Sequence, residues 1–265
     1  MFTASALFLA ASNAMSEERH FVLATGTSAQ DSGLLNHLVA RFYEQTGIRV
    51  RVVAVGTGQA FALGARGDAA ALLTHDLTGE LAFVADGFGR DRRPVMHNHF
   101  IIVGPRNDPA GIADTRTVQS ALKRLAMREA RFFSRGDDSG THRQERRVWT
   151  ALSLDPSSFG SWYREAGGAM GQTLLTAIEM DAYALSDSAT WVTFNQKRDH
   201  IVLTQSDAAI VNQYASLLAT HPDIPEADRA AAVEWHEWLT GTAGQAAIAD
   251  FKVNGERLFS PGAPN

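Results

Sequence analysis

The sequence predicts an α/β protein of two lobes, each a mixed sheet flanked by helices, joined by a two-strand hinge. Strand-like and helix-like segments alternate through residues 21–103, a pattern that favours parallel strands with helices on both faces. A turn-rich Gly-Pro-Arg-Asn-Asp-Pro stretch then interrupts this pattern, and a second alternation follows it. We therefore expect residues 21–103 and 213–265 to form lobe 1 and residues 104–212 to form lobe 2.

In lobe 1 the expected strands are short apolar or β-branched runs, and the expected helices place apolar residues at helical spacing. Gly47 is expected to end the first long helix. The strands cover 21–25, 49–55, 71–74 and 95–103, and the helices cover 34–46, 60–65 and 77–85.

In lobe 2 the same criteria predict strands at 131–134, 183–187 and 201–203, and an extended run at 209–218 that leads back to lobe 1. The amphipathic segment 225–239 begins with a proline that suits the start of a helix. The expected helices of lobe 2 are 118–129, 143–152, 159–165 and 172–180, and 225–239 and 244–251 are expected in the C-terminal part of lobe 1.

The composition is that of an ordinary globular protein, with 45% hydrophobic and 20% charged residues in 265. The net charge of −5 gives no indication of the basic face that nucleic-acid binding usually requires, so we expect no nucleic-acid partner. The absence of cysteine excludes disulfides and thiolate metal sites.

Residues 1–20 are expected to be a signal remnant or a tag outside the fold. The apolar run Phe2–Ala11 resembles the core of a secretory signal, and Ser12-Asn13-Ala14 offers a small-residue cleavage site, but a positively charged start is missing. The run is too short to span a membrane. Ser12-Asn13-Ala14-Met15 also fits a cloning scar, and of the two interpretations we favour export to the periplasm.

The segment Ser134–His142 predicts a loop that leads into a helix N-terminus, with Ser139 as the N-cap. Such a terminus presents unpaired backbone N–H groups and the positive end of a helix dipole, which both suit an anion. Arg135 adds a guanidinium that can bind an oxyanion through two hydrogen bonds. The alternative is a capped helix with a solvated turn.

Two further hydroxyl-rich loops follow expected strands, at Thr27-Ser28 and at Thr57-Gly58. In α/β sheets, ligands lie at the carboxyl ends of strands, so the three loops are expected to meet on one small anion. Each of them alone fits an ordinary turn or cap, and none has the pattern of a nucleotide P-loop. The expected ligand-binding residues are Thr27, Ser28, Thr57, Gly58, Arg135, Ser139, Gly140 and Thr141.

Several motifs together resemble the tungstate-binding proteins of bacterial ABC uptake systems, a branch of the type II periplasmic binding proteins. The likeness covers nearly all of residues 21–261, and Ser-Arg-Gly-Asp-Asp-Ser-Gly-Thr is its most specific part. The matching segments are Ala24–Ser28, Val55–Ala60, Val103–Pro105, Asp108–Ile112, Phe133–His142, Trp162–Tyr163, Glu165–Gly167, Met170–Gly171 and Leu258–Phe259.

The resemblance implies a type II periplasmic-binding-protein fold with an oxyanion, most simply tungstate, held by hydrogen bonds in the cleft between the lobes. It implies a periplasmic monomer that delivers its ligand to an ABC transporter permease, without a cofactor or a resident metal. The loop around Arg135 is also similar to that of phosphate-binding proteins. Molybdate, phosphate and sulfate therefore stay open as alternative ligands.

The chain departs from the family pattern at three places near the expected cleft. Gly26 stands where the family usually has Thr, and Ser188 and Ala189 stand where Arg and Gly are expected. The Asn-Pro-Tyr-Gly pattern has become Asn212-Gln213-Tyr214-Ala215. These departures leave the selectivity among oxyanions open.

Asp137 and Asp138 are unexpected in an anion site. We expect one of them to orient Arg135 or to accept hydrogen bonds from the loop backbone, and the other to be solvated. A carboxylate that faced the ligand would instead favour a protonated oxyanion such as hydrogen phosphate, which can donate to it.

A hydrolase that uses Ser139 and His142, with Asp137 as the orienting group, is a less favoured alternative. These residues lie within one turn and its lead-in, and the chain has no Gly-x-Ser-x-Gly elbow. His97 and His99 share one face of an expected strand and form a weak candidate for a metal pair. The segment Trp235–Trp238 is expected to serve helix packing.

Overall fold

The computed structural model describes residues 18–205 and 210–262. Nearly all of the expected signal segment and the first residue of the expected strand 209–218 lie outside the described residues. Within the described part, no helix combines the length and the apolar character that crossing a membrane requires.

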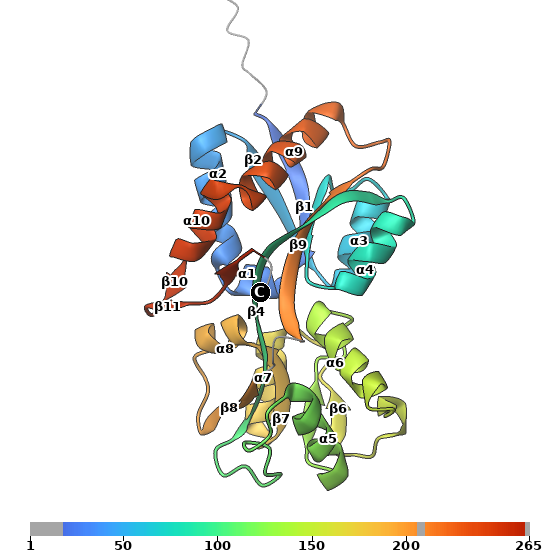
Figure 1. Cartoon of the computed structure of the whole chain (residues 1–265), viewed down its shortest axis with the longest axis vertical. Helices are drawn as coiled ribbons and strands as arrows, with labels where there is room; N and C mark the ends of the chain where they lie inside the picture. Colours follow the sequence, from blue (N-terminus) through green and yellow to red (C-terminus); the bar gives the residue numbers. More distant parts are fainter. Residues whose placement is uncertain (1–17, 206–209, 263–265) are drawn as a thin grey trace, which may run out of the picture.

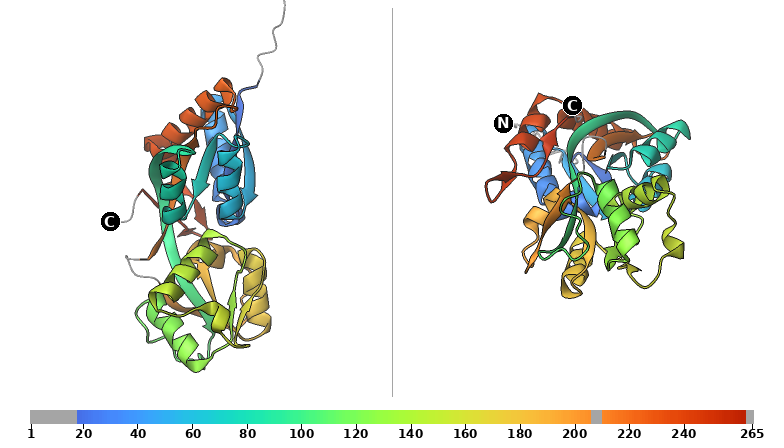
Figure 2. Two further views of the ribbon diagram at one scale, coloured as in Figure 1. Left: turned by 90° about the vertical axis from the view of Figure 1, so that its right-hand side faces the viewer. Right: turned by 60° about the horizontal axis from the view of Figure 1, so that its bottom comes forward.

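The chain forms two lobes that lie end to end along the long axis of the molecule (Figures 1 and 2). The sheet of lobe 1 has the order β2-β1-β3-β9-β4, in which β1, β2 and β3 are parallel and β9 is antiparallel to both of its neighbours. Its strands are β1 (His20–Gly26), β2 (Arg49–Val55), β3 (Ala71–Thr74), β4 (Gly89–Pro105) and β9 (Val211–Ala219).

Helices flank this sheet on both sides, with α2, α9 and α10 on one side and α3 and α4 on the other (Figure 1). They are α1 (Thr27–Asp31), α2 (Leu34–Thr46), α3 (Thr57–Ala65), α4 (Leu77–Ala85), α9 (Glu226–Thr240) and α10 (Thr242–Asp250). The short strands β10 (Lys252–Val253), β11 (Glu256–Arg257) and β12 (Ser260–Pro261) follow, and β12 pairs with β4.

Lobe 2 is also a mixed sheet with helices around it. Strand β5 is parallel to β6 and β7, while β7 and β8 are antiparallel to β4. Its strands are β5 (Phe132–Ser134), β6 (Tyr163–Glu165), β7 (Tyr183–Asp187) and β8 (His200–Gln205). Its helices are α5 (Val118–Arg128), α6 (Gly140–Ala151), the 3₁₀ turn η1 (Pro156–Ser158), α7 (Met170–Glu179) and α8 (Ser188–Thr193).

The long strand β4 belongs to both lobes. Its first part, to His99, pairs with β9, whereas Phe100 to Pro105 pair with β7 and β8 (Figure 1). The sheet partner therefore changes between His99 and Phe100. The two strands β4 and β9 form the connection between the lobes, and the expected lobe boundaries after residues 103 and 212 stay predictions.

Each lobe buries its own aromatic core. In lobe 1 the buried ring of Trp235 contacts Phe21 and Phe42, with ring centroids 6.3 and 5.2 Å apart. In lobe 2 the buried ring of Trp149 lies 6.2 Å from Phe132. Burial of large apolar side chains is the main force that holds each lobe together.

The expected helix at residues 159–165 is wrong, because Tyr163 to Glu165 form strand β6 beside β5. Phe159 and Trp162 each lie within 6.5 Å of Trp149, ring centroid to ring centroid. Phe159 and Trp162, whose spacing resembled one face of a helix, therefore pack around the indole of Trp149 from a segment that is not helical. Long-range packing here overrides the local pattern.

Candidate functional site

The loop between β5 and α6 presents the N-terminus of α6 to the other lobe. Ser139 is the N-cap, as predicted, because its Oγ accepts a hydrogen bond from His142 N at 3.3 Å. Helix α6 begins at Gly140, three residues earlier than expected. Gly136 has φ of 62°, and a Cβ there would lie 2.5 Å from Glu165 Cβ, so this turn requires glycine.

Arg135 connects this loop to lobe 1. Its guanidinium is 2% exposed, and it donates to Thr27 Oγ1 at 3.3 Å and to Ser28 Oγ at 3.5 Å. Both hydroxyls belong to the first turn of α1, directly after strand β1. The structure therefore brings together residues from two of the three predicted loops.

Asp137 orients Arg135, as expected for one of the two loop carboxylates. Its Oδ2 accepts from Arg135 Nη2 at 2.5 Å, and its Oδ1 accepts from Ser139 N at 3.2 Å. Asp138 is exposed, but it is not merely solvated, because Arg143 binds both of its carboxylate oxygens at 2.8 and 2.7 Å. Both acidic side chains of the loop are thus paired with arginine.

The third predicted loop, at the start of α3, lies against these acidic residues. A Cβ on Gly58 would lie 2.4 Å from Asp138 Oδ2 and 2.9 Å from Arg143 Nη2. A Cβ on Gly56 would lie 3.3 Å from the Asp137 carbonyl oxygen. The lobes are therefore in contact at this point, and a side chain at residue 58 would force the Asp138–Arg143 pair to shift.

A hollow of about 460 Å³ opens at this junction of the two lobes. Thr27, Gly58 and Arg135 line it, whereas the other predicted ligand residues are not among its lining side chains. Ser28, Thr57, Ser139 and Thr141 are at most 5% exposed, and Gly140 is also buried. The remaining lining residues are Gly56, Gln59, Asp137, Asp138, Gly167, Gly168 and Ala169.

Several buried polar atoms in this region have no hydrogen-bond partner within the described part of the chain. Arg135 Nε and Thr141 Oγ1 are among them. Buried polar groups are nearly always hydrogen-bonded, so such atoms require an explanation. Both are predicted ligand residues, and an oxyanion would give each an acceptor.

A buried hydrogen-bonded chain runs behind the site, from His75 through the two connecting strands. The His75 Nδ1 atom lies 2.6 Å from Asn212 Oδ1, and Asn212 Nδ2 donates to Asn98 Oδ1 at 2.7 Å. Asn98 Nδ2 in turn donates to Asp187 Oδ1 at 3.1 Å, and Asp187 caps α8 at Thr190. The chain joins both crossing strands to the site.

His75 also seals the contact between the lobes. Its ring stacks on Tyr214, with centroids 4.6 Å apart, and a Cβ on Gly140 would lie 2.5 Å from His75 Cε1. Burial lowers the pKa of His75, so the ring is neutral near pH 7 and donates through Nδ1 to Asn212. A neutral ring adds no charge to the site.

The departures from the family pattern differ in their surroundings. A Cβ on Gly26 would lie 3.4 Å from His75 Nε2, which is ordinary contact distance, so space does not impose glycine there. Ser188 Oγ accepts a weak hydrogen bond from His99 N at 3.4 Å on β4. Asn212 and Tyr214 take part in the buried chain behind the site.

The geometry of Ser139 and His142 does not form a nucleophile and base. The Ser139 hydroxyl oxygen accepts from the backbone of His142, while the imidazole Nδ1 accepts from Asp138 N at 3.1 Å. Burial lowers the pKa of His142. The imidazole therefore serves the loop backbone instead of the Ser139 hydroxyl.

The two other candidate sites, the pair His97 and His99 and the segment Trp235–Trp238, make local contacts and packing contacts. His97 Nδ1 lies 3.3 Å from the Gly262 carbonyl oxygen, and the described residues contain no group of three or more metal-ligating side chains. His236 and Trp235 are fully buried, and His236 Nδ1 lies 2.8 Å from Ser216 Oγ. The segment Trp235–Trp238 thus serves helix packing, as predicted.

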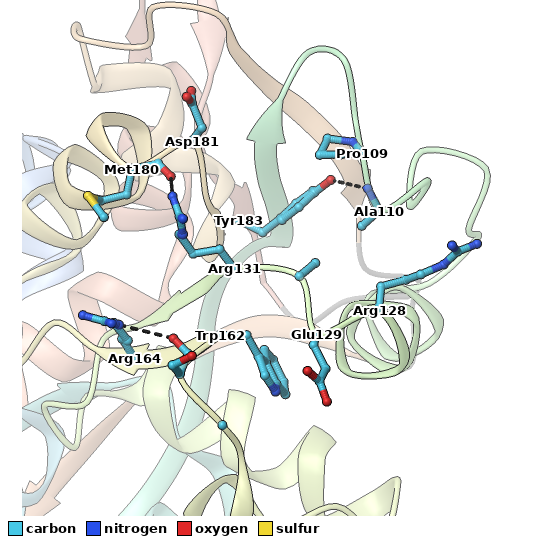
Figure 3. A pocket seen from close by; sticks show the side chains of 13 residues that line it. Pro109, Ala110, Arg128, Glu129, Arg131, Trp162, Arg164, Met180, Asp181 and Tyr183 are labelled. Atoms are coloured by element: carbon cyan, nitrogen blue, oxygen red, sulfur yellow. Dashed lines mark hydrogen bonds between the residues drawn. The ribbon is translucent and has the colours of Figure 1, made fainter.

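A larger hollow than the one at the junction lies elsewhere in lobe 2, and Figure 3 shows its lining side chains. Its volume is about 890 Å³, and Arg128, Arg131, Arg164 and Trp162 are among its lining residues. Arg131 donates to the Met180 carbonyl oxygen, so part of its donor capacity is already used. This hollow faces the N-terminal ends of β5 to β7, whereas ligands of α/β sheets lie at the carboxyl ends.

The sequence interpretation missed the segment that leads into α7. Gly167, Gly168 and Ala169 line the hollow at the junction, and Ala169 is the N-cap of α7. Gly167 N donates to the Arg135 carbonyl oxygen at 2.8 Å, which holds this segment beside the loop. The signal was present, because Glu165–Gly167 and Met170–Gly171 belong to the motifs quoted above, but no binding role was assigned to them.

Comparison with known proteins agrees with this architecture. The family described as "PBP superfamily domain" matches residues 11–242. The tungstate-binding protein TupA of Peptoclostridium acidaminophilum is 39% identical over 247 residues, which span 91% of this chain and 85% of the relative.

Two solved structures are similar over most of the chain. The tungstate ABC transporter structure from Geobacter sulfurreducens has 42% identity and a TM-score of 0.79, and the match covers 88% of this chain and 99% of that one. The tungstate-binding protein TupA from Desulfovibrio alaskensis G20 has 35% identity and a TM-score of 0.79, with 92% and 99% of the two chains covered.

Proposed function

Because this chain belongs to the PBP superfamily, we propose that it is a solute-binding protein that captures tungstate between its lobes and delivers it to an ABC transporter. The names of its relatives indicate a binding protein rather than an enzyme. The ligand residues of this proposal are Thr27, Ser28, Thr57, Gly58, Arg135, Ser139, Gly140 and Thr141.

The buried guanidinium of Arg135 carries the proposal. It lies beside the hydroxyls of Thr27 and Ser28 and keeps one N–H without a protein partner within the described residues. One cation leaves a dianion only partly neutralised. The N-termini of α3 and α6 supply the remaining stabilisation through backbone N–H groups and helix dipoles.

The pairing of Asp137 bears on the choice among oxyanions with and without a proton. Both of its carboxylate oxygens already accept hydrogen bonds, from Arg135 and from Ser139 N. Each oxygen keeps a second lone pair, so Asp137, which lines the hollow, can still accept the proton of hydrogen phosphate. Tungstate, molybdate and sulfate need donors alone, and of these the relatives' names favour tungstate.

The proposed setting is the periplasm, with an ABC transporter permease as the partner of the monomeric protein. Closure of the two lobes around β4 and β9 would exclude water from the bound anion and strengthen each hydrogen bond to it. Release would then require the lobes to separate.

The test is isothermal titration of the purified protein with tungstate, molybdate, sulfate and phosphate, each at the same pH and salt concentration. The expected result is 1:1 binding that is tightest for tungstate and is weakened by Arg135→Lys. Phosphate as the tightest ligand would contradict tungstate as the proposed ligand. No heat with any of the four anions would contradict oxyanion capture.

A further inference from the structure

An ion-pair cluster around the buried carboxylate of Asp76 joins the lobes beside the anion site, and its residues Asp76, Arg143 and Arg147 do not line that site. Asp76, the residue before α4 in lobe 1, has a carboxylate that is 1% exposed. Arg143 Nη1 lies 2.9 Å from its Oδ2, and Arg147 Nη1 lies 2.7 Å from its Oδ1. Both arginines belong to α6 in lobe 2.

This cluster is continuous with the proposed anion loop. Arg143 also binds both carboxylate oxygens of Asp138, two residues before the α6 N-terminus. The same guanidinium lies over Gly58 at the start of α3. A path of direct contacts therefore runs from Asp76 in lobe 1 to the loop that carries Arg135.

The surroundings of Asp76 stabilise its buried charge only while the two lobes are in contact. Burial disfavours the ionised carboxyl, but the guanidiniums of Arg143 and Arg147 outweigh this effect and lower the pKa of Asp76 below its ordinary value. When the lobes separate, the arginines leave with α6, and Asp76 exchanges them for water. A buried carboxylate that loses one of its cationic partners raises the free energy of the protein. The cluster therefore stabilises the arrangement in which the lobes are in contact.

Given the proposed oxyanion capture, on which this inference rests, we propose that Asp76 is a positioning residue that latches lobe 1 to Arg143 and Arg147 and thereby sets how long the anion stays bound. Asp76 itself does not touch the ligand. The latch holds α6 and the loop before it in place, and the resulting closed state slows dissociation.

The first test measures tungstate binding kinetics by stopped-flow tryptophan fluorescence in Asp76→Asn. The expected result is a dissociation rate about 10- to 100-fold faster than in the unchanged protein, with an association rate changed by less than about threefold. Asp68→Asn is the matched control, because Asp68 forms an exposed ion pair with Arg66 inside lobe 1. The control is expected to leave both rates unchanged.

A double-mutant cycle with Arg147→Gln separates the contact from general destabilisation. Arg147 is partly exposed and contacts Asp76 and Gln144. The double variant is expected to dissociate faster than the original protein by a factor clearly smaller than the product of the two single-variant factors. Independent effects of the two substitutions, or an unchanged dissociation rate in Asp76→Asn, would overturn the latch.

Lobe closure can be measured without relying on tungstate. The chain has no cysteine, so spin labels on Ala246→Cys in α10 and Lys123→Cys in α5 report a single distance between the lobes. Asp76→Asn is expected to shift this distance towards separated lobes, with or without ligand. If the unchanged protein binds no tungstate but the distance still shifts, the proposed function fails, and with it the effect on anion release, whereas the role of Asp76 in holding the lobes together stands. An unshifted distance overturns the latch.

Discussion

The Arg135 guanidinium donates to Thr27 Oγ1 at 3.3 Å, although 108 positions separate the two residues. This hydrogen bond joins the loop before α6 in lobe 2 to the first turn of α1 in lobe 1. It exists only when the two lobes are in contact. The proposed anion site is thus assembled by the same approach that would enclose the ligand.

Replacing Arg135 tests the cationic part of this site. Arg135→Lys keeps the charge but loses the planar fork that can bind two oxygens at once. We expect a tungstate affinity about 10- to 100-fold lower, the range for losing one charge-assisted hydrogen bond. Titration calorimetry measures it, and an affinity within twofold of the original would exclude Arg135 as a ligand.

Gly58→Ala tests the close approach of α3 to the Asp138–Arg143 pair. The added Cβ would displace this pair when the lobes meet, whereas alanine suits a helix turn better than glycine. We expect a ligand-free melting temperature that is unchanged or higher, and a tungstate affinity about tenfold lower. Calorimetry and thermal melting measure the two effects.

Gly171→Ala is the control for this substitution. Gly171 is the second residue of α7, as Gly58 is the second residue of α3, but a Cβ on Gly171 would meet no atom within 4 Å. Both stability and affinity should stay close to the original. Equal losses of affinity in the two variants would mean that the contact with Asp138 is irrelevant.

Glu145 gives the protein a specific pH dependence of stability. Burial raises the pKa of Glu145 to about 7, although hydrogen bonds from Trp149 and Tyr163 oppose the rise. A carboxyl whose pKa is higher in the folded state than in the unfolded state favours folding while it is protonated. Its contribution is therefore complete below the unfolded pKa of 4.5 and is lost as the pH rises through 7.

Glu145→Gln should remove this dependence, because glutamine keeps an acceptor for the hydrogen bonds and carries no proton to lose. We expect the variant to be more stable than the original protein at pH 8, by up to about 3 kcal/mol, with a smaller difference at pH 5. Urea unfolding at both pH values measures it. A difference that does not vary with pH would refute the raised pKa.

Asn98 links the two crossing strands, and its removal should destabilise the whole chain of hydrogen bonds. Asn98→Ala leaves the buried Asn212 Nδ2 without an acceptor and removes one of the donors to the buried Asp187, which keeps its hydrogen bonds from Thr190. We expect a loss of about 2–4 kcal/mol in unfolding free energy, since an unsatisfied buried group costs roughly 1–3 kcal/mol and a lost hydrogen bond about 1 kcal/mol. Urea unfolding measures it, and Asn36→Ala on the exposed face of α2 is the control.

The sequence by itself determined most elements of secondary structure. Strands β2, β3 and β7 and helix α4 begin and end where the local pattern placed them. The N-cap at Ser139 was also predictable. These features depend on residues within a few positions of each other, so hydrophobic periodicity and capping preferences reveal them.

Only the tertiary structure decided how the lobes meet. Asp76 and Arg147 are 71 positions apart, and nothing in the sequence indicates that they pair. The same holds for Asn98 and Asn212. The strand at Tyr163–Glu165 likewise follows from packing around Trp149 and pairing with β5. Such contacts form between segments that are remote in the chain, and their energy comes from burial and charge pairing that a local pattern does not contain.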